Sequence, residues 1–465
     1  MLFSSITFIY YFLPVVLLLY YITPRKWKNV VLFLSSIVFY AWGEPKYVFL
    51  MVGSVLIGYI AGLCMDLRYK KVVLVVSIGL CLLALIYFKY TNFFVNNINI
   101  VLQTQLPLLK IVMPIGISFY TFQIISYVID VYRGQVEKQR NFLSLATYIS
   151  MFPQLIAGPI VRYSDIHGQL TKREIKSSRV ADGIIRFAIG LSKKVLIANQ
   201  LGELCQMFRE SDEKTILFYW VYAVAIALQI YFDFSGYSDM AIGLGKLLGF
   251  SFSENFNYPF MSKSVTEFWR RWHISLGNWF RDYVYIPLGG NRKGLGRQLF
   301  NILLVWMLTG FWHGAQWNFV IWGLLFAILL MIEKMWLYEK LQTAIIWNRI
   351  YMFLVVTISF VIFDATDMNQ LLVNIKNLFF LGNVSDRNIV GIECLYYFKS
   401  YGSILLIAML GATDLPKKCY LRIREQASVK SLFVVLEPVV ILGMLLLSTA
   451  YLVDGSFNPF LYFRF

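Results

Sequence analysis

The chain has 465 residues, of which 58% are hydrophobic (AVILMFWYC) and only 15% are charged. Soluble globular domains carry about 25% charged residues, because water has to wet their surfaces. These proportions exclude a disordered chain and a secreted disulfide scaffold, and they predict a polytopic membrane protein. The apolar runs are continuous rather than alternating, which favours membrane helices over a transmembrane β-barrel.

The charge balance is strongly basic, with 42 Lys and Arg against 26 Asp and Glu and a formal net charge of +16. Such a balance can indicate an anionic partner, such as nucleic acid, a phosphorylated cofactor or a lipid head group. In a membrane protein, however, cytoplasmic loops collect Lys and Arg, and these residues fix the orientation of the helices. We interpret the excess mainly in this second way and expect no nucleic-acid partner. The five cysteines include no pair with CxxC spacing, so they predict no metal or redox site.

The length sets the number of membrane spans. A spanning helix needs about 20 mostly apolar residues, so the chain has room for roughly ten to thirteen of them in one helical body. The first run lacks a basic start and a cleavage site, so we expect a retained helix rather than a signal peptide. Basic clusters follow the first, third and fifth runs, which places those ends in the cytoplasm. The first five expected spans are 1–23, 29–42, 47–65, 72–88 and 111–131.

The next apolar run, 143–161, does not fit this alternation, because basic residues flank it on both sides. The stretch that follows, 162–186, holds six Lys or Arg against three Asp or Glu. The run also contains Pro153 and Gly158-Pro159, which interrupt helices. We therefore expect a re-entrant element. Broken backbone at membrane depth is tolerated only where protein packs around it or where it lines a cavity, so the run also predicts an internal chamber.

The second half of the chain is expected to contain more spans around one polar stretch. Residues 183–201 carry Lys193 and Lys194, which we expect to face a water-filled cavity or to reach the interface. The stretch 253–299 holds seven Lys or Arg against three Asp or Glu and many aromatic residues, which predicts amphipathic helices on the cytoplasmic interface. We expect residues 1–465 to form a single integral-membrane domain. The remaining expected spans are 215–233, 299–311, 317–332, 350–364, 401–412 and 431–453.

His313 is the strongest candidate for a catalytic residue. It lies between apolar runs, where an ionisable side chain is costly unless it has a task or a partner. Desolvation would keep the imidazole neutral at pH 7, and a neutral imidazole can accept a proton as a general base. The neighbouring Trp312 would form an apolar wall, and Gly314 would let a ligand approach closely. The alternative is a hydrogen-bonded histidine that only packs in the interior.

The other two histidines carry weaker predictions. His273 follows Trp269-Arg270-Arg271-Trp272 in the amphipathic stretch. It is either an interfacial histidine beside two arginines or a second polar group at the mouth of a chamber. His167 lies in a segment whose composition predicts a polar loop, and we expect no catalytic role for it.

A polar segment follows the expected span 215–233. Asp233, Ser235 and Asp239 could form the wall of a polar chamber, together with Trp312 and Asn318. Alternatively, Asp233 and the residues after it mark a helix end followed by an N-cap. The two carboxylates are not accompanied by a tight set of His or Cys residues, so no metal site is predicted.

The remaining motifs favour direct group transfer. The glycine-rich, basic run 287–294 could cradle phosphates, although such a run is more often a turn. The sequence has no GxSxG elbow and no recognisable Cys-His pair, so no nucleophile is predicted. One good base without a nucleophile suits direct transfer of an activated group to a hydroxyl.

These motifs together resemble the membrane-bound O-acyltransferase (MBOAT) superfamily, in its bacterial alginate O-acetyltransferase branch. The resemblance runs nearly end to end. It is sharpest in Phe268-Trp269-Arg270-Arg271-Trp272-His273, in Pro287-Leu288-Gly289-Gly290-Asn291-Arg292 and in Trp312-His313-Gly314.

The resemblance implies an all-α ring of membrane helices, with re-entrant and interfacial helices around a central funnel. It implies that an acyl group, expected to be acetyl, moves from a cytoplasmic thioester to a hydroxyl acceptor, for O-acetylation of an envelope polysaccharide outside the plasma membrane. The donor would be acetyl-CoA or an acyl-carrier thioester, with no metal and no bound cofactor. Membrane lipid and an extracytoplasmic SGNH-type acetyltransferase or esterase are the implied partners.

The resemblance also implies residue roles. His313 matches the catalytic histidine of the family, and His273 matches its second functional histidine, which we expect to position the donor or to stabilise the oxyanion. Candidates for binding the donor phosphates are Arg270, Arg271, Arg281, Arg292 and Lys293.

The sequence departs from the family pattern at two places, and other functions stay open. Trp322-Gly323 is not followed by the second His-Gly of many relatives, and Phe363-Asp364-Ala365 replaces a Phe-Arg-Ala. One alternative function is D-alanyl transfer to teichoic acid from a carrier-protein thioester. Another is a non-enzymatic transporter or scaffold subunit.

Overall fold

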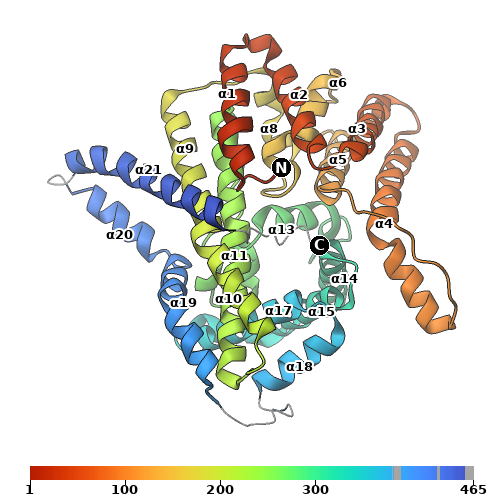
Figure 1. Ribbon diagram of the computed structural model, residues 1–465. Helices are drawn as coiled ribbons and strands as arrows, with labels where there is room; N and C mark the ends of the chain where they lie inside the picture. Colours follow the sequence, from red (N-terminus) through yellow and green to blue (C-terminus); the bar gives the residue numbers. More distant parts are fainter. Residues whose placement is uncertain (380, 382–388, 427–429, 456–465) are drawn as a thin grey trace. The chain divides into compact units, whose positions relative to one another are not determined.

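The computed structural model describes residues 1–379, 381, 389–426 and 430–455, in which the regular elements are all helices (Figure 1). The chain divides into two compact units. The first contains residues 1–187, 238–254 and 278–283, and the second contains the remainder of the described chain. The expected all-α class is confirmed. Compact units need not fold independently, so one integral-membrane domain over 1–465 stays a prediction.

Several helices are long and apolar enough to cross a bilayer. The described residues contain seven of them: Pro45–Asp66, Lys70–Leu102, Ile216–Leu247, Trp317–Thr343, Trp347–Asp364, Ile392–Gly411 and Leu432–Asp454. A shorter apolar helix covers Thr7–Ile22. The chain is therefore a multi-pass membrane protein, as expected. The helices at the other expected spans do not reach this length or this apolarity, so a total of ten to thirteen crossings stays a prediction.

The first unit is built from the N-terminal helices. Helices α3 and α4 pack on α5, and α2 packs on α6; Figure 1 shows α3, α4 and α5 as neighbours. The helices are η1 (Thr7–Phe12), α1 (Leu13–Ile22), α2 (Lys28–Ala41), α3 (Val48–Leu63), α4 (Lys70–Leu102), α5 (Ile117–Tyr132), α6 (Phe142–Ser150), α7 (Phe152–Leu155) and α8 (Tyr163–Thr171). His167 lies on α8 and is exposed, so the expectation of a loop there is wrong, although the side chain is solvated as expected.

The helix break predicted in 143–161 is confirmed. Helix α6 ends at Ser150, and α7 is a single turn that carries Pro153. Gly158 has a φ of +104°, a conformation that suits glycine. The whole stretch 144–161 is buried, as broken backbone in a membrane protein has to be.

Helix α11 (Ile216–Leu247) is longer than expected, and the interpretation of Asp233 as a helix end is wrong. The polar residues from Asp233 onward suggested a helix end followed by an N-cap, and glycine is a weak helix former. In the structure, a Cβ added at Gly236 would lie 2.7 Å from the carbonyl oxygen of Gly190 on α9 (Ser177–Ser192). The glycine therefore lets two helix backbones approach closely, and this packing outweighs its low propensity.

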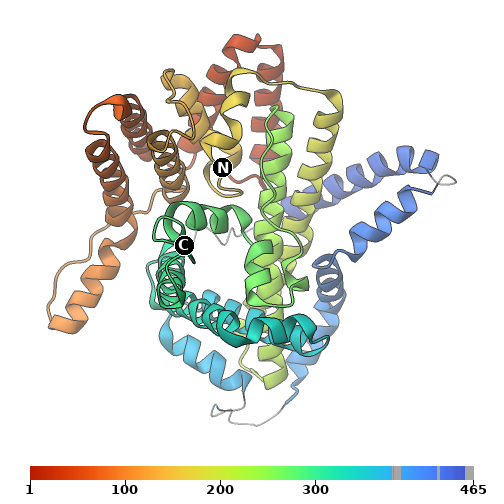
Figure 2. The same ribbon diagram turned by 180° about the vertical axis from the view of Figure 1, so that it is seen from behind.

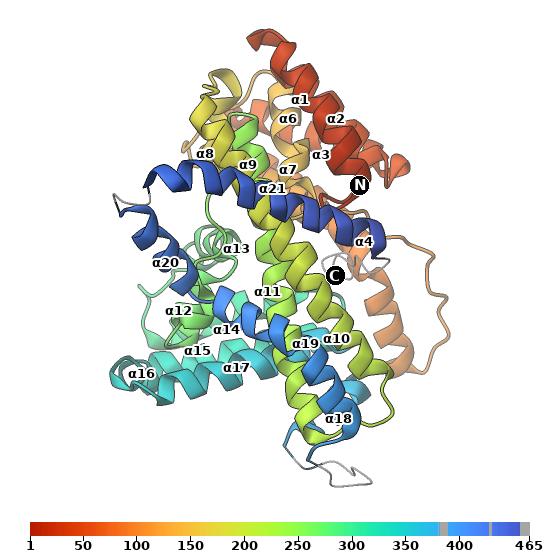
Figure 3. The ribbon, with the colours of Figure 1, turned by 60° about the vertical axis from the view of Figure 1, so that its left-hand side comes forward.

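The second unit contains the C-terminal helices. Helix α15 packs against α12, α14 and α17; Figures 2 and 3 show α14, α15 and α17 as neighbours from two further directions. The elements are α10 (Asn199–Glu210), α12 (Val265–Arg271), α14 (Leu295–His313), α15 (Trp317–Ile332), η8 (Glu333–Leu337), α16 (Tyr338–Thr343), α17 (Trp347–Asp364), α18 (Met368–Leu378), α19 (Ile392–Gly411), α20 (Leu415–Arg424) and α21 (Lys430–Asp454). Helix α13 (Ile274–Phe280) and η7 (Arg281–Tyr285) have residues in both units.

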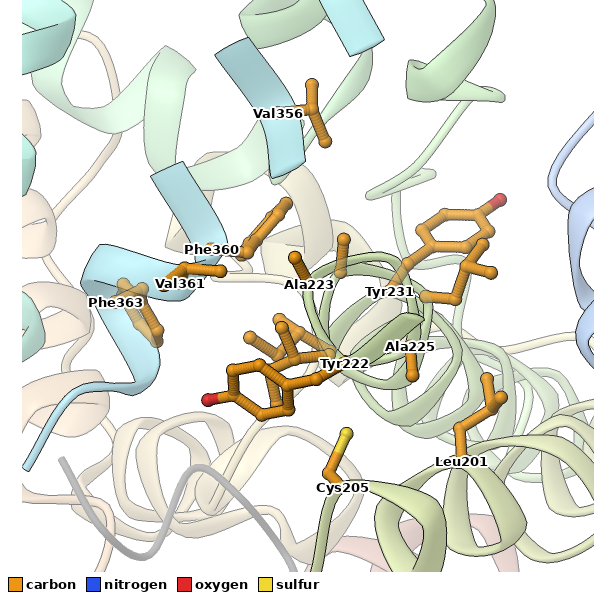
Figure 4. Packing of buried hydrophobic residues seen from close by; sticks show 14 of the residues in the cluster. Leu201, Cys205, Tyr222, Ala223, Ala225, Tyr231, Val356, Phe360, Val361 and Phe363 are labelled. Atoms are coloured by element: carbon orange, nitrogen blue, oxygen red, sulfur yellow. The ribbon is translucent and has the colours of Figure 1, made fainter. Parts of the chain in front are cut away.

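The core of the second unit joins α10, α11 and α17. Figure 4 shows Phe360 and Val361 of α17 beside Ala223 of α11. Phe268 and Trp272 belong to the same buried cluster. The stretch 253–299 thus contains helices, as predicted, but they are short and partly internal rather than purely interfacial.

Candidate functional site

His313 is the last residue of α14 and is buried. Three aromatic rings surround its imidazole. The ring centroids of Trp312, Trp322 and Phe363 lie 5.0, 5.1 and 5.2 Å from it. The apolar wall expected from Trp312 is present, and two other helices, α15 and α17, contribute to it.

Glycines bring these helices together. A Cβ on Gly323 of α15 would lie 2.5 Å from the carbonyl oxygen of Trp306 and 3.3 Å from the Cα of Gly310, both on α14. No larger side chain fits between the two backbones. Gly323 follows Trp322 directly, so this close approach carries the Trp322 ring to His313.

Asn318, predicted to line a chamber, has a different role in the structure. Its amide nitrogen Nδ2 donates to the carbonyl oxygens of Phe363 at 3.1 Å and Ala365 at 2.9 Å. These bonds satisfy carbonyls at the end of α17, where the helix leaves them without partners. Asn318 therefore fixes the position of Phe363 against His313.

His273 lies between α12 and α13 and is buried, so the interpretation as an interfacial histidine is wrong. Its φ is +43°, a left-handed conformation that is uncommon outside glycine. The ring packs against Phe234 of α11 at a centroid distance of 4.7 Å and against Trp312 at 6.0 Å. Trp312 thus contacts both histidines, and the structure brings the two predicted catalytic residues to one site.

Asn255 and Ser275 hold the His273 ring, and both were missed in the sequence. Nδ1 of His273 lies 3.2 Å from Oδ1 of Asn255. The same oxygen accepts from the backbone N–H of Ser275 at 3.2 Å and from its hydroxyl at 2.9 Å. Burial lowers the pKa of His273 to about 3, so the imidazole is neutral at pH 7.

Glu333 is a further residue that the sequence did not indicate. Its buried carboxylate accepts from the N–H groups of Val265 at 2.6 Å and Thr266 at 2.8 Å. It also accepts from the hydroxyls of Thr266 at 2.7 Å and Tyr351 at 3.1 Å. A carboxylate at a helix N-terminus stabilises orphan N–H groups and the helix dipole. Glu333 thereby anchors α12, the helix that leads directly to Trp272 and His273.

The two aspartates predicted for a chamber wall on α11 are engaged in ion pairs. Asp233 pairs with Lys194 at 2.6 Å in the second unit, and both side chains are buried. The expectation that Lys194 faces a water-filled cavity or reaches the interface is therefore wrong. Asp239 pairs with Arg186 at 2.6 Å in the first unit. Ser235 is buried. Within the described residues, no cluster of three or more His, Cys, Asp or Glu could hold a metal ion.

The five candidates for donor binding differ in availability. Arg271 pairs with Glu267 at 2.7 Å, and Arg281, in the first unit, pairs with Asp282 at 2.7 Å. The pKa of the Asp282 carboxyl is lowered by hydrogen bonds from Arg281 and Arg162, against the effect of its burial. Arg270, Arg281, Arg292 and Lys293 are exposed, whereas Arg271 is partly buried.

The glycine-rich run 287–294 forms a turn, as expected for a run of this composition. Gly289, Gly290 and Gly294 have φ values of +105°, +54° and +83°. Asn301 of α14 donates from Nδ2 to the carbonyl oxygen of Gly290 at 3.0 Å. The turn is therefore tied to the helix that ends at His313.

Asp364, which departs from the family motif, has its own partners. Its Oδ2 lies 2.5 Å from Nη2 of Arg209 and accepts from the Tyr222 hydroxyl at 2.6 Å. Its carboxylate raises the pKa of the Arg209 guanidinium, in opposition to burial. The guanidinium beside position 364 thus belongs to Arg209 of α10, whereas the family motif has an arginine at position 364 itself, on α17.

Comparison with known proteins gives consistent matches. Residues 135–363 match the family described as MBOAT, membrane-bound O-acyltransferase family. A probable alginate O-acetylase from Pseudomonas putida is 37% identical over the full length of both chains. Its counterpart from Pseudomonas aeruginosa is 42% identical over 79% of this chain and 73% of its own. A peptidoglycan O-acetyltransferase from Helicobacter pylori is 34% identical over 83% of this chain and 81% of its own.

Proposed function

Because the chain belongs to the membrane-bound O-acyltransferase family, in its alginate O-acetylase-like branch, we propose that this O-acyltransferase acetylates an envelope polysaccharide. Two kinds of relative, an alginate O-acetylase and a peptidoglycan O-acetyltransferase, support an acetyl group and an envelope polysaccharide. The identity of the polymer differs between these relatives, so the proposal specifies only a polysaccharide hydroxyl.

The observation that carries the mechanism is that one aromatic ring, that of Trp312, contacts both histidines. His313 is buried, and the Trp312 ring beside it also touches His273. A buried, neutral imidazole can take the proton of an acceptor hydroxyl. The hydroxyl oxygen then attacks the thioester carbonyl, the C–S bond breaks, and the imidazolium returns the proton to the leaving thiolate. No acyl-enzyme is needed in this sequence.

The donor in this proposal is acetyl-CoA or an acyl-carrier thioester. Arg270, Arg292 and Lys293 are exposed and are the best placed of the five candidates to bind its phosphates. Arg271 and Arg281 would first have to leave their carboxylate partners. We place the stretch 253–299 on the cytoplasmic side, where such a donor is available. Membrane lipid surrounds the helices, and an extracytoplasmic SGNH-type enzyme would complete delivery to the polymer.

The test is release of ester-linked groups from purified envelopes by mild base, identified by mass. Wild-type cells, deletion cells and cells with His313→Ala are compared. His167→Ala is the matched control, because it removes an exposed histidine on α8. We expect acetate to disappear in the deletion and in His313→Ala and to persist in His167→Ala. Loss of D-alanine instead would move the function to teichoic acid. Acetate retained in His313→Ala would contradict the catalytic role, and acetate retained in the deletion would leave a transport or scaffold function.

A further inference from the structure

We propose that Asn255 fixes the ring proton of His273 on Nδ1, which leaves Nε2 to accept a hydrogen bond from an O–H or N–H group of a substrate. Asn255 is thus a positioning residue, and His273 does not donate to the oxyanion. The inference rests on the proposed acyl transfer.

The hydrogen bonds around Asn255 decide the proton's position. The backbone N–H of Ser275 can only donate, and it lies 3.2 Å from Oδ1 of Asn255. This atom is therefore the amide oxygen, an acceptor, rather than the nitrogen. Since the same oxygen lies 3.2 Å from Nδ1 of His273, Nδ1 has to be the N–H nitrogen. A neutral imidazole has one N–H, so Nε2 carries a lone pair.

The surroundings of the ring keep it neutral. Phe234 of α11 and Trp312 of α14 face the ring, and Asn255 and Ser275 contact Nδ1. All four side chains are uncharged. Burial without a neighbouring charge lowers the pKa of His273 to about 3. Nε2 therefore carries no proton to donate in the working pH range.

Nε2 is available to a ligand. The atom is buried, and it has no hydrogen-bond partner within the described part of the chain. Leaving a buried acceptor without a donor costs about 1–3 kcal/mol. A hydroxyl of the acceptor or an amide N–H of the donor would satisfy it. Both are hydrogen-bond donors, whereas the developing oxyanion is an acceptor and would be repelled by the lone pair.

The backbone shows that residue 255 also holds the turn. His273 has a φ of +43°, and the next residue, Ile274, donates its N–H to the carbonyl oxygen of Asn255 at 3.0 Å. Strained backbone of this kind persists only where its surroundings fix it. Asn255 thus binds the strained turn through its main chain and the imidazole through its side chain.

A direct test is nitrogen NMR of the full-length protein labelled with 15N-histidine. The chain has only three histidines, so single histidine variants assign the signals. We expect His273 to show a protonated Nδ1 and an unprotonated Nε2 between pH 6 and pH 8. A proton on Nε2, or an imidazolium in this range, would overturn the inference.

A kinetic test uses Asn255→Leu and Asn255→Asp. Leucine has a similar volume and no acceptor, so we expect kcat to fall by about 10–100-fold. KM should rise only for the substrate whose O–H or N–H group meets Nε2, which distinguishes the acceptor hydroxyl from the donor amide. Aspartate keeps the acceptor but adds a negative charge, so the acid limb of the pH–rate profile should move to higher pH.

Asn257→Asp is the control, because it adds the same charge two residues away on an exposed side chain. Its profile should match the wild type, and an equal shift in both Asp variants would contradict the assignment. The His313→Ala variant separates the two proposals. If it is active, the proposed function fails. If it is inactive while Asn255→Leu has wild-type kcat, only the role of Asn255 fails.

Discussion

The surroundings of the two histidines differ in kind. His313 ends a 19-residue helix and is enclosed by the rings of Trp312, Trp322 and Phe363. His273 lies in a left-handed turn between two seven-residue helices, and an amide and a hydroxyl contact its Nδ1. The first site excludes water by packing, and the second fixes a proton by hydrogen bonding. A base needs the former, and a group that orients a substrate needs the latter.

The largest effect is expected from the histidines themselves. His313→Gln should lower kcat by about 10²–10⁴-fold, because glutamine cannot act as a general base. His273→Gln should lower kcat less, by roughly 10–100-fold, because it removes an orienting hydrogen bond rather than the base. Purified protein with an acyl thioester and a soluble hydroxyl acceptor gives both rates. Equal losses would contradict the division of roles between the two sites.

The next largest effect is expected from Glu333, which anchors α12 next to His273. Glu333→Gln places an amide N–H₂ group among four donors, so at least one of the hydrogen bonds to Val265, Thr266 or Tyr351 is lost. We expect a loss of about 1–3 kcal/mol in stability and a fall in kcat. The melting temperature of the purified protein and its kcat are measured on the same preparation.

The matched control for this change is Glu339→Gln, which removes the same charge from an exposed side chain on α16. It should leave both quantities within experimental error of the wild type. Thr266→Val and Thr266→Ser refine the result, since only serine keeps the hydroxyl that donates to Glu333. A wild-type rate in Glu333→Gln would show that α12 does not need this anchor.

A third change tests the packing on the His313 side. Gly323→Ala forces a methyl group against the carbonyl oxygen of Trp306, and overpacking of this kind costs about 1–3 kcal/mol. We expect a lower melting temperature and a lower kcat, because Trp322 is displaced from His313. Gly443→Ala on α21 is the control. A Cβ there meets no atom within 4 Å, and alanine favours the helix, so the melting temperature should not fall.

These contrasts also explain what the sequence could predict. A histidine that lies between apolar runs and near glycines indicates its own environment within a short stretch of sequence, so the sequence predicts His313. In the same way, Pro153 predicts the helix break at its own position. Asn255 and Glu333 were not predicted, because each acts on residues that are distant in sequence: Asn255 on His273 and Glu333 on Val265. Neither the periodicity of apolar residues nor the spacing of motifs predicts contacts between residues so far apart in the sequence. Helix α11 was predicted too short for the same reason, since the contact of Gly236 with Gly190 is a tertiary effect.

The last expected effect is a gradual one, the pH dependence of stability, and it applies to His273. Its pKa is about 3 in the folded protein and about 6.5 in an unfolded chain. Between these values the unfolded state binds more protons, so stability rises with pH and is lost as the pH falls below about 6.5. The slope contributed by one such group is at most about 1.4 kcal/mol per pH unit.

Melting temperatures of the wild type and of His273→Gln, recorded from pH 4.5 to pH 7.5, test this contribution. The wild type should lose stability faster on acidification than the variant, while His167→Ala should follow the wild type because that side chain is exposed. Parallel curves for the wild type and His273→Gln would mean that His273 is protonated without penalty. In that case the ring would be solvated, and the contrast between a fixed proton at His273 and a dry base at His313 would not hold.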